Sequence, residues 1–210
     1  MASNTIDCKA QDDLRLPPKF ILVSVPEQRL TLWEDGRIVR RYRISTSKFG
    51  LSNRSGSYGT PLGWHTIAAK IGDGVPVGGV FKNRVWTGEV LPVNAPGRDP
   101  IVTRILWLSG EEWHNSNSYD RKIYIHGTPE ESTLGINSSY GCVRMASRDV
   151  IDLYDRVHVG TPVLISLLST LSPEVRLQVA SYWRYAHSPS FAFQQREPAF
   201  SGMREAPPVP

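Results

Sequence analysis

Residues 20–45 read FILVSVPEQRLTLWEDGRIVRRYRIS, and this stretch predicts the fold class of the chain. The apolar run at 20–25 predicts a buried strand, which the following Pro26-Glu27 ends. Apolar and polar residues then alternate up to Asp35-Gly36, a pair suited to the positive φ angles of a two-residue hairpin turn. Residues 38–45 follow as the returning strand. The stretch therefore predicts three neighbouring strands in an antiparallel meander.

Strands also dominate the prediction for the rest of the chain. The 210 residues include 17 glycines and 16 prolines, which interrupt the sequence too often for a helical bundle. Residues 48–99 are rich in Gly, Ser, Pro and Asn with short apolar runs, and we expect loops over a β scaffold there. Further strands are expected at 101–108, 122–125 and 162–168. Together these patterns predict a mainly β domain.

Two helices are expected in the second half of the chain. Ser147 is a natural N-cap and Gly160 a stop, so the pattern predicts a helix between them, just after Cys142. A second, weaker helix is expected at 173–186. The apolar stripe of the first helix consists of Val150, Ile151, Tyr154 and Val157.

Composition and charge exclude several classes of protein. With 40% hydrophobic and 21% charged residues, the chain is not disordered throughout. Its longest apolar runs are far shorter than the roughly 18 residues that cross a bilayer, so no transmembrane segment is expected. The 24 basic and 20 acidic residues are interspersed and give a net charge of only +4, so no nucleic-acid partner is expected.

The first 19 residues form a polar arm with three aspartates and no apolar run, so they do not serve as a secretory leader as written. The protein is therefore expected in the cytoplasm if the sequence is complete, and in the periplasm or at the cell wall if a leader is missing. The two cysteines, Cys8 in this arm and Cys142 far along the chain, make no disulfide framework.

His126 and Cys142 are the sharpest chemical feature of the sequence. The histidine follows a predicted strand, and the cysteine comes sixteen residues later, across one loop. A loop that folds back brings imidazole and thiol within hydrogen-bond reach, which a cysteine nucleophile needs because the thiolate is the attacking species. Gly141 permits positive φ, and amide N–H groups around Cys142 are candidate oxyanion donors. Arg144 is a candidate for binding a substrate carboxylate through its fork of donors.

Spacing alone leaves other interpretations open. A lone buried cysteine is usually an inert small hydrophobe. In papain-like peptidases the cysteine precedes the histidine, which disfavours that class. A zinc site of Cys142, His126 and His114 has neither paired spacing nor a clear fourth ligand, so no metal is expected. The acidic pairs Glu111-Glu112 and Glu130-Glu131 are expected to be solvated instead of forming a glycosidase site.

Several segments, in order along the chain, resemble the L,D-transpeptidase catalytic-domain family of bacterial peptidoglycan enzymes. The resemblance covers approximately residues 20–168, and several matches in the right order are more specific than any one of them. The matching segments are VPEQRL at 25–30, ISTSKFG at 44–50, GTPLG at 59–63, HGT at 126–128 and GCVRM at 141–145.

The resemblance implies a sandwich-like or barrel-like β fold with Cys142 as nucleophile and His126 as its base. It implies that the carbonyl of Gly127 orients the imidazole, and it makes Ser139 and Arg144 candidates for substrate contact. The implied reaction is attack on the bond between meso-diaminopimelate and the terminal D-alanine of a tetrapeptide stem, through a Cys142 thioester, and carbapenems are expected to acylate the same thiol. An amine acceptor then gives a crosslink or attachment, and water gives a tripeptide. No metal or organic cofactor is implied.

One residue departs from the family pattern. That pattern has Ser or Thr, His, Gly and Cys, whereas this chain has Ser139-Tyr140-Gly141-Cys142. We expect His126 to keep the base role and Tyr140 to reshape the site or change the choice of acceptor. Two alternatives remain beside the transpeptidase. One is an L,D-carboxypeptidase that uses water and recycles muropeptides, and the other is a catalytically silent wall-binding homologue.

The predicted organisation has three parts. A polar N-terminal arm occupies 1–19, the catalytic domain 20–168, and a C-terminal helix with a Pro-rich tail 169–210. From Ser188 the tail has little apolar periodicity, so poor order is expected there.

Overall fold

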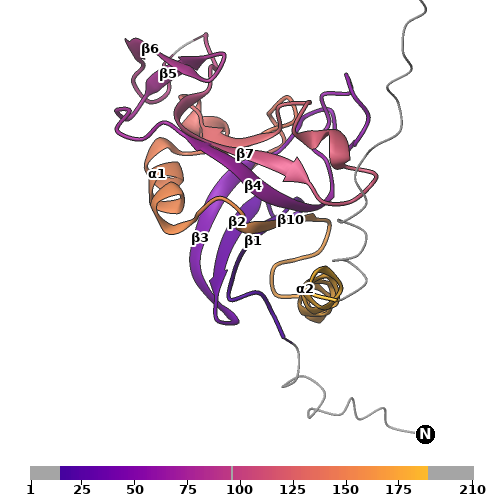
Figure 1. The fold of residues 1–210 in the computed structure, drawn as a ribbon. Helices are drawn as coiled ribbons and strands as arrows, with labels where there is room; N and C mark the ends of the chain where they lie inside the picture. The colour runs from indigo at the N-terminus through magenta and orange to yellow at the C-terminus, as the bar shows by residue number, and fades with distance from the viewer. Residues whose placement is uncertain (1–14, 96, 189–210) are drawn as a thin grey trace, which may run out of the picture.

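The structure is a computed structural model that describes residues 15–95 and 97–188 (Figure 1). The strands are β1 (Lys19–Ser24), β2 (Arg29–Glu34), β3 (Arg37–Ser45), β4 (Gly63–Ile71), β5 (Gly79–Lys82), β6 (Val85–Val90), β7 (Val102–Gly110), β8 (Tyr124–Gly127), β9 (Val143–Met145) and β10 (Pro162–Ser166). The helices are the 3₁₀ helices η2 (Ser116–Ser118) and η3 (Glu131–Thr133) and the α-helices α1 (Ser147–Arg156) and α2 (Pro173–Ala186). The prediction of a mainly β domain is confirmed.

The antiparallel meander predicted for the first three strands is present. β1 pairs with β2 along its whole length, and β2 pairs with β3, both antiparallel. In the turn between β2 and β3, Asp35 has a φ of 47° and Gly36 a φ of 75°. Positive φ at both central residues fits a type I′ turn, whose twist matches that of the flanking strands.

The sheet closes on itself, so of the two predicted forms, sandwich-like and barrel-like, the structure has the barrel-like one. β10 runs parallel to β1, and β4 pairs with both β10 and β7. The circuit of strands runs β4-β10-β1-β2-β3-β9-β8-β7 and returns to β4. β5 and β6 form a hairpin attached to β7, and this hairpin stands out from the barrel at the upper left of Figure 1.

Two apolar clusters bury the two faces of β1. Ile21 and Val23 belong to a cluster that joins most of the barrel strands to α1. The alternate residues Phe20 and Leu22 pack in a second cluster with α2. β1 is therefore covered on both sides, as its continuous apolar sequence predicts. α1 and α2 lie on different sides of the barrel (Figure 1).

The predicted start of the first helix is wrong. Ala146 is the N-cap of α1, and Ser147 is already inside the helix. The Ser147 hydroxyl accepts a hydrogen bond from Thr103 at 2.9 Å, so it makes no cap. The Ser147 N–H instead donates to the carboxylate of Glu131 at 2.9 Å. The Glu131 side chain of η3 therefore binds an N-terminal N–H of α1, the role that the sequence assigned to the Ser147 hydroxyl.

Other predicted boundaries also shift. α1 ends at Arg156 instead of reaching Gly160, and β10 ends at Ser166 instead of residue 168. β8 starts at Tyr124, so His126 lies within the strand instead of after it. α2 has the bounds predicted for the weaker helix, 173–186.

Most of the predicted polar arm and the Pro-rich tail from 189 onward lie outside the described residues. Within the described part of the chain, no helix has both the length and the apolar character needed to cross a membrane.

Candidate active site

Parallel pairing of β8 with β9 brings the predicted catalytic residues together. The register places His126 beside Arg144, and Ile125 beside Val143. Cys142 directly precedes β9. Because side chains alternate between the two faces of a sheet, His126 and Cys142 project from the same face. On that face they are diagonal neighbours on adjacent strands, a separation that longer side chains can span.

The opposite face of these two strands is core. Ile125 and Val143 are fully buried in the apolar cluster that includes α1. A shift of one residue in the pairing of β8 with β9 would turn one of these apolar residues outward and one chemical residue inward. Burial of the core face therefore fixes the positions of the imidazole and the thiol.

His126 is held in one orientation by its own strand. Its Nδ1 lies 2.9 Å from the carbonyl oxygen of Gly127, the contact that the resemblance implied. A carbonyl only accepts, so Nδ1 carries the proton and Nε2 presents a lone pair in the neutral ring. Burial lowers the pKa of His126, against the opposing effects of the Gly127 carbonyl and the negative charge of Asp99. The imidazole is therefore neutral near pH 7 and able to accept a proton.

Cys142 is half-buried and packs against an apolar cluster that includes Ile105 and Tyr124. Its S–H donates to the carbonyl oxygen of Lys122, with sulfur and oxygen 3.4 Å apart. Desolvation raises the pKa of the Cys142 thiol to about 11, although the Tyr124 backbone and the positive charge of Arg121 act in the opposite direction. The thiol is therefore protonated at neutral pH, and its attack on a carbonyl needs a base.

Ser139 and Gly141 shape the loop in front of Cys142. The Ser139 hydroxyl donates to the carbonyl of Cys142 at 2.6 Å, and the Gly141 N–H donates to the same hydroxyl oxygen at 3.3 Å. Gly141 has a φ of 120°, which an L side chain rarely adopts. Ser139 is fully buried. The structure thus places Ser139 in the internal bonding of the loop, whereas the sequence predicted a substrate contact.

Arg144 is bound within the fold. Its side chain is only 2% exposed, and its Nη1 donates to the carboxylates of Asp99 and Glu130. Its Nη2 donates to the hydroxyls of Thr133 and Ser138. Since both terminal nitrogens are bound to groups of the protein, the guanidinium is not open to a substrate carboxylate in this structure. Arg144 instead ties the segment before β7 and the segment after β8 to β9.

The sequence profile of the L,D-transpeptidase catalytic domain, YkuD, matches residues 18–165 of this chain. The chain belongs to this L,D-transpeptidase family. The match coincides with the barrel and with α1, and it ends inside β10. Helix α2 lies beyond it.

Known L,D-transpeptidases are similar to this chain over much of its length. It is 28% identical to the probable L,D-transpeptidase ErfK/SrfK of Salmonella typhimurium over 80% of this chain and 50% of that protein. It is 26% identical to the putative L,D-transpeptidase YkuD of Bacillus subtilis over 71% of this chain and 66% of that protein. L,D-transpeptidase 3 from Mycobacterium tuberculosis, solved with a faropenem-derived adduct, aligns at 20% identity and a TM-score of 0.47 over 71% of this chain and 60% of that one. The chain spans about half the length of the Salmonella relative.

Two charged residues near His126 and Cys142 were missed by sequence reasoning. Asp99 binds Arg144 and also accepts a hydrogen bond from the Thr128 hydroxyl at 2.5 Å. Arg121 donates to the carbonyl of Gly59 at 2.7 Å and lies close enough to affect the thiol of Cys142. Neither residue belongs to a local motif, so no signal in the sequence marked them.

Tyr140, the residue at which the sequence departs from the pattern of the resemblance, is exposed two residues before Cys142. Its ring contacts the rings of Phe49 and Tyr58. Its hydroxyl accepts a hydrogen bond from the Lys48 ammonium at 2.8 Å. Tyr140 therefore belongs to an exposed aromatic cluster that also contacts Lys48, two residues before Cys142.

The sequence predicted that the acidic pairs Glu111-Glu112 and Glu130-Glu131 are solvated, but their carboxylates bind groups of the protein. Glu111 accepts a hydrogen bond from the Thr66 hydroxyl at 2.7 Å, and Glu112 accepts one from the Trp64 N–H at 2.6 Å. Glu130 binds Arg144, and Glu131 binds the Ser147 N–H at the start of α1. Each of these carboxylates thus stabilises the fold.

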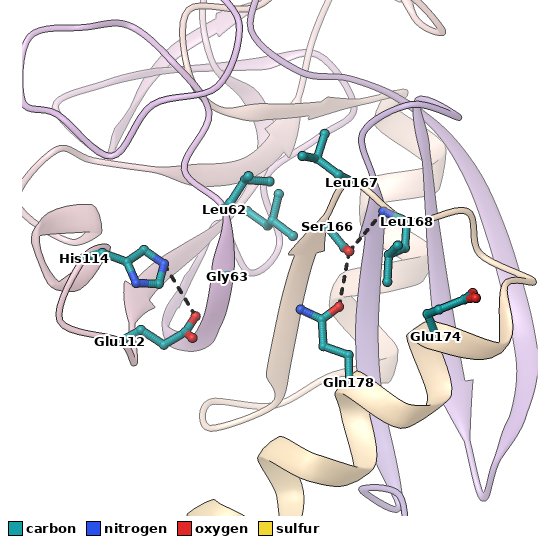
Figure 2. Close-up of a pocket in the computed structure, with 10 residues that line it drawn as sticks. Leu62, Gly63, Glu112, His114, Ser166, Leu167, Leu168, Glu174 and Gln178 are labelled. Carbon is teal, nitrogen blue, oxygen red and sulfur yellow. Dashed lines mark hydrogen bonds and ion pairs between the residues drawn. The ribbon is translucent and has the colours of Figure 1, made fainter. Parts of the chain in front are cut away.

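A cavity of about 530 Å³ lies away from the catalytic motif, between the loop of Glu112 and His114 and the helix α2. Figure 2 shows Gln178 of this helix pointing toward Ser166 at the end of β10. His114 lies 3.8 Å from the Glu112 carboxylate on the wall of this cavity. The structure therefore separates His114 from the pair formed by His126 and Cys142.

Proposed function

We propose that this chain is a cysteine acyltransferase that acts on the tetrapeptide stems of peptidoglycan. The observation that carries the proposal is the pairing of β8 with β9, which sets a neutral, oriented His126 beside Cys142 on one face. Membership of the L,D-transpeptidase family supports the substrate class. The residues assigned to the reaction are Cys142 as nucleophile, His126 as base and Gly127 as the residue that orients the base.

In the first step, the Cys142 sulfur attacks the carbonyl carbon between the diamino acid and the terminal D-alanine. His126 takes the thiol proton at Nε2 during this attack, because the raised thiol pKa leaves no preformed thiolate. The C–S bond forms and the C–N bond breaks. The proton passes from His126 to the leaving amine, and D-alanine departs.

In the second step, an amine or water attacks the thioester carbon. His126 removes a proton from the attacking group and returns one to the departing Cys142 sulfur. The new C–N or C–O bond replaces the C–S bond. The Cys142 N–H is proposed to stabilise the oxyanion in both steps, because the Gly141 N–H already donates to the Ser139 hydroxyl.

Arg144 is proposed as a positioning residue in this reaction. A buried guanidinium that binds two carboxylates is costly to disturb, because breaking such a pair leaves an uncompensated charge. Arg144→Lys should therefore slow acylation by the tetrapeptide and by a small activated thioester to the same extent. A larger loss with the tetrapeptide would restore the direct substrate contact that the sequence predicted.

The proposal is tested by incubating the protein with purified disaccharide-tetrapeptide and analysing the products by mass. A crosslinked dimer or an exchange product shows the transpeptidase, and a tripeptide alone shows the L,D-carboxypeptidase. An unchanged tetrapeptide indicates the silent wall-binding homologue.

A carbapenem serves as a second probe of the nucleophile. Intact-protein mass measurement should find one adduct on the wild type and none on Cys142→Ala. His114→Ala is a matched control, because this histidine lies on the separate cavity, and it should keep the adduct. An adduct that survives in Cys142→Ala would contradict the assignment.

A further inference from the structure

A cluster of three exposed aromatic rings and one lysine stands directly beside the nucleophile loop. The exposed fractions of Phe49, Tyr58 and Tyr140 are 53%, 60% and 58%. Their ring centroids lie 5.5 to 6.2 Å apart. The Lys48 ammonium lies 4.1 Å from the centroid of the Tyr140 ring and 5.4 Å from that of Phe49. Large apolar side chains gathered on a surface commonly mark a binding site.

Backbone bonds fix this cluster to the nucleophile loop. The Lys48 N–H donates to the carbonyl of Ser139 at 3.0 Å, and Ser47 forms a β-bridge with the same residue. The Ser47 hydroxyl donates to the carbonyl of Tyr58 at 2.6 Å. The cluster therefore keeps a set position relative to Cys142, two residues beyond Tyr140.

The charge of Lys48 remains available to a ligand. Its ammonium donates one hydrogen bond to the Tyr140 hydroxyl and, among the described residues, forms no ion pair with a carboxylate. An ammonium has three donors, so two are left. Arg144, the other candidate for an anionic substrate group, is buried against Asp99 and Glu130. Lys48 thus keeps free donors for an anion beside the nucleophile.

We propose that Lys48, with the rings of Phe49 and Tyr140, binds the carboxylate of the amino acid that leaves or enters at the acyl carbon. This inference rests on the proposed function. In that reaction, D-alanine departs from the acyl carbon and an acceptor amine arrives at the same place. A D-amino acid acceptor carries the same carboxylate next to its amine, so one subsite serves both. A protein lysine acceptor has no carboxylate beside its ε-amine and gains nothing from Lys48.

The acceptor arm of the test uses D-methionine and D-methioninamide, which differ only in the carboxylate. The thioester is formed with tetrapeptide, and the rates of the two exchange products are measured for wild type and Lys48→Gln. The variant should lose about 3- to 5-fold with D-methionine, as expected for an exposed ion pair, and change little with the amide. Comparing each acceptor between the two proteins cancels the difference in amine basicity.

The donor arm uses the tetrapeptide and its C-terminal carboxamide, and measures release of D-alanine or D-alaninamide. Lys48→Gln should slow the release of D-alanine from the tetrapeptide and leave the release of D-alaninamide from the carboxamide unchanged. This arm tests the proposal even if water is the natural acceptor. Lys48→Arg should restore both preferences, and added salt should weaken them. Arg37→Gln, on the β2–β3 hairpin, removes one exposed positive charge elsewhere. It should change neither the acid-to-amide rate ratio of the acceptors nor that of the donors.

Equal effects on acid and amide, or no effect on either, would overturn this inference. If Phe49→Ala slows reaction of the disaccharide-tetrapeptide but not of the free tetrapeptide, the rings bind the sugar, which also overturns it. Failure of the proposed function has a different signature, because the wild type would then form no thioester with either the tetrapeptide or a carbapenem.

Discussion

His65 and His126 have almost the same local environment, yet they differ at one nitrogen. Both lie in strands of the barrel, both are buried, and in both Nδ1 lies about 3 Å from a nearby backbone carbonyl oxygen. The Nε2 of His65 is 3.0 Å from the Ser118 hydroxyl. Among the described residues, the Nε2 of His126 has no hydrogen-bond partner. One ring is therefore fully satisfied within the fold, and the other keeps a lone pair for chemistry.

The difference shows that burial and orientation do not by themselves leave a histidine nitrogen free to accept a proton. Burial lowers the pKa of both rings, and that of His65 falls to about 4. What distinguishes His126 is the neighbouring strand, since β9 brings the thiol of Cys142 to the same face. In His65 the corresponding Nε2 is hydrogen-bonded to the Ser118 hydroxyl, so this ring has a structural role.

The sharpest test of this comparison replaces each histidine by alanine. His126→Ala should lower the rate of carbapenem acylation by about 10²- to 10⁴-fold, because no base then removes the thiol proton. His65→Ala should leave the rate per folded molecule near that of wild type while lowering the free energy of unfolding by about 1–3 kcal/mol, because a buried hydroxyl loses its partner. The rates come from time-resolved intact mass and the stabilities from urea unfolding. Comparable loss of rate in both variants would abolish the distinction.

The second prediction concerns stability against pH, where His65 should act. Its pKa is about 4 in the folded state and about 6.5 in the unfolded state, so the unfolded chain binds a proton first as the pH falls. The free energy of unfolding should therefore be highest above pH 6.5 and fall between about pH 6.5 and 4, by at most about 3 kcal/mol from this group.

His126 contributes in the same direction, since its pKa is also lowered. Urea unfolding at several pH values measures the slope. His65→Gln should flatten it, even if the variant is less stable at every pH. A slope as steep as that of wild type would show that other groups control the acid transition.

The third prediction separates the histidines by the pH dependence of acylation. The rate should be flat near pH 7 and fall at lower pH, with a midpoint below 6.5, because only the neutral ring of His126 accepts the thiol proton. Below the midpoint the rate should fall about tenfold per pH unit. His65→Gln should leave this midpoint unchanged, whereas Asp99→Asn should move it lower, since the charge of Asp99 favours the protonated ring.

The pattern of local residues was enough to predict most of the barrel. The run at 20–25, the Asp35-Gly36 turn and the helix at 173–186 depend on periodicity and turn chemistry, which neighbouring residues carry. The pair of His126 and Cys142 was also visible, because both lie in motifs that resemble a family. The structure adds the register that puts them on one face.

The features that the sequence did not predict depend on contacts between distant residues. Ser147 seemed a natural cap until Glu131 and Thr103 proved to bind it. The partner of Arg144, Asp99, lies 45 residues earlier in a loop with no motif. Ser118 likewise lies 53 residues from His65. Local patterns do not show such partners, so they cannot tell a satisfied polar group from a free one.

The smallest expected effect concerns Tyr140, and it asks whether one free imidazole nitrogen is enough. If His126 alone serves as base, Tyr140→His should remain active with an acylation rate near that of wild type. Tyr140→Phe removes only the hydroxyl that binds Lys48, an exposed hydrogen bond, so it should shift the ratio of tripeptide to D-methionine exchange product by about two- to threefold. The ratio is measured by mass in all three proteins under the same conditions. An unchanged ratio in both variants would remove Tyr140 from acceptor selection. An inactive wild type with an active Tyr140→His variant would show that this site needs a second imidazole. The contrast between His126 and His65 would then not explain catalysis.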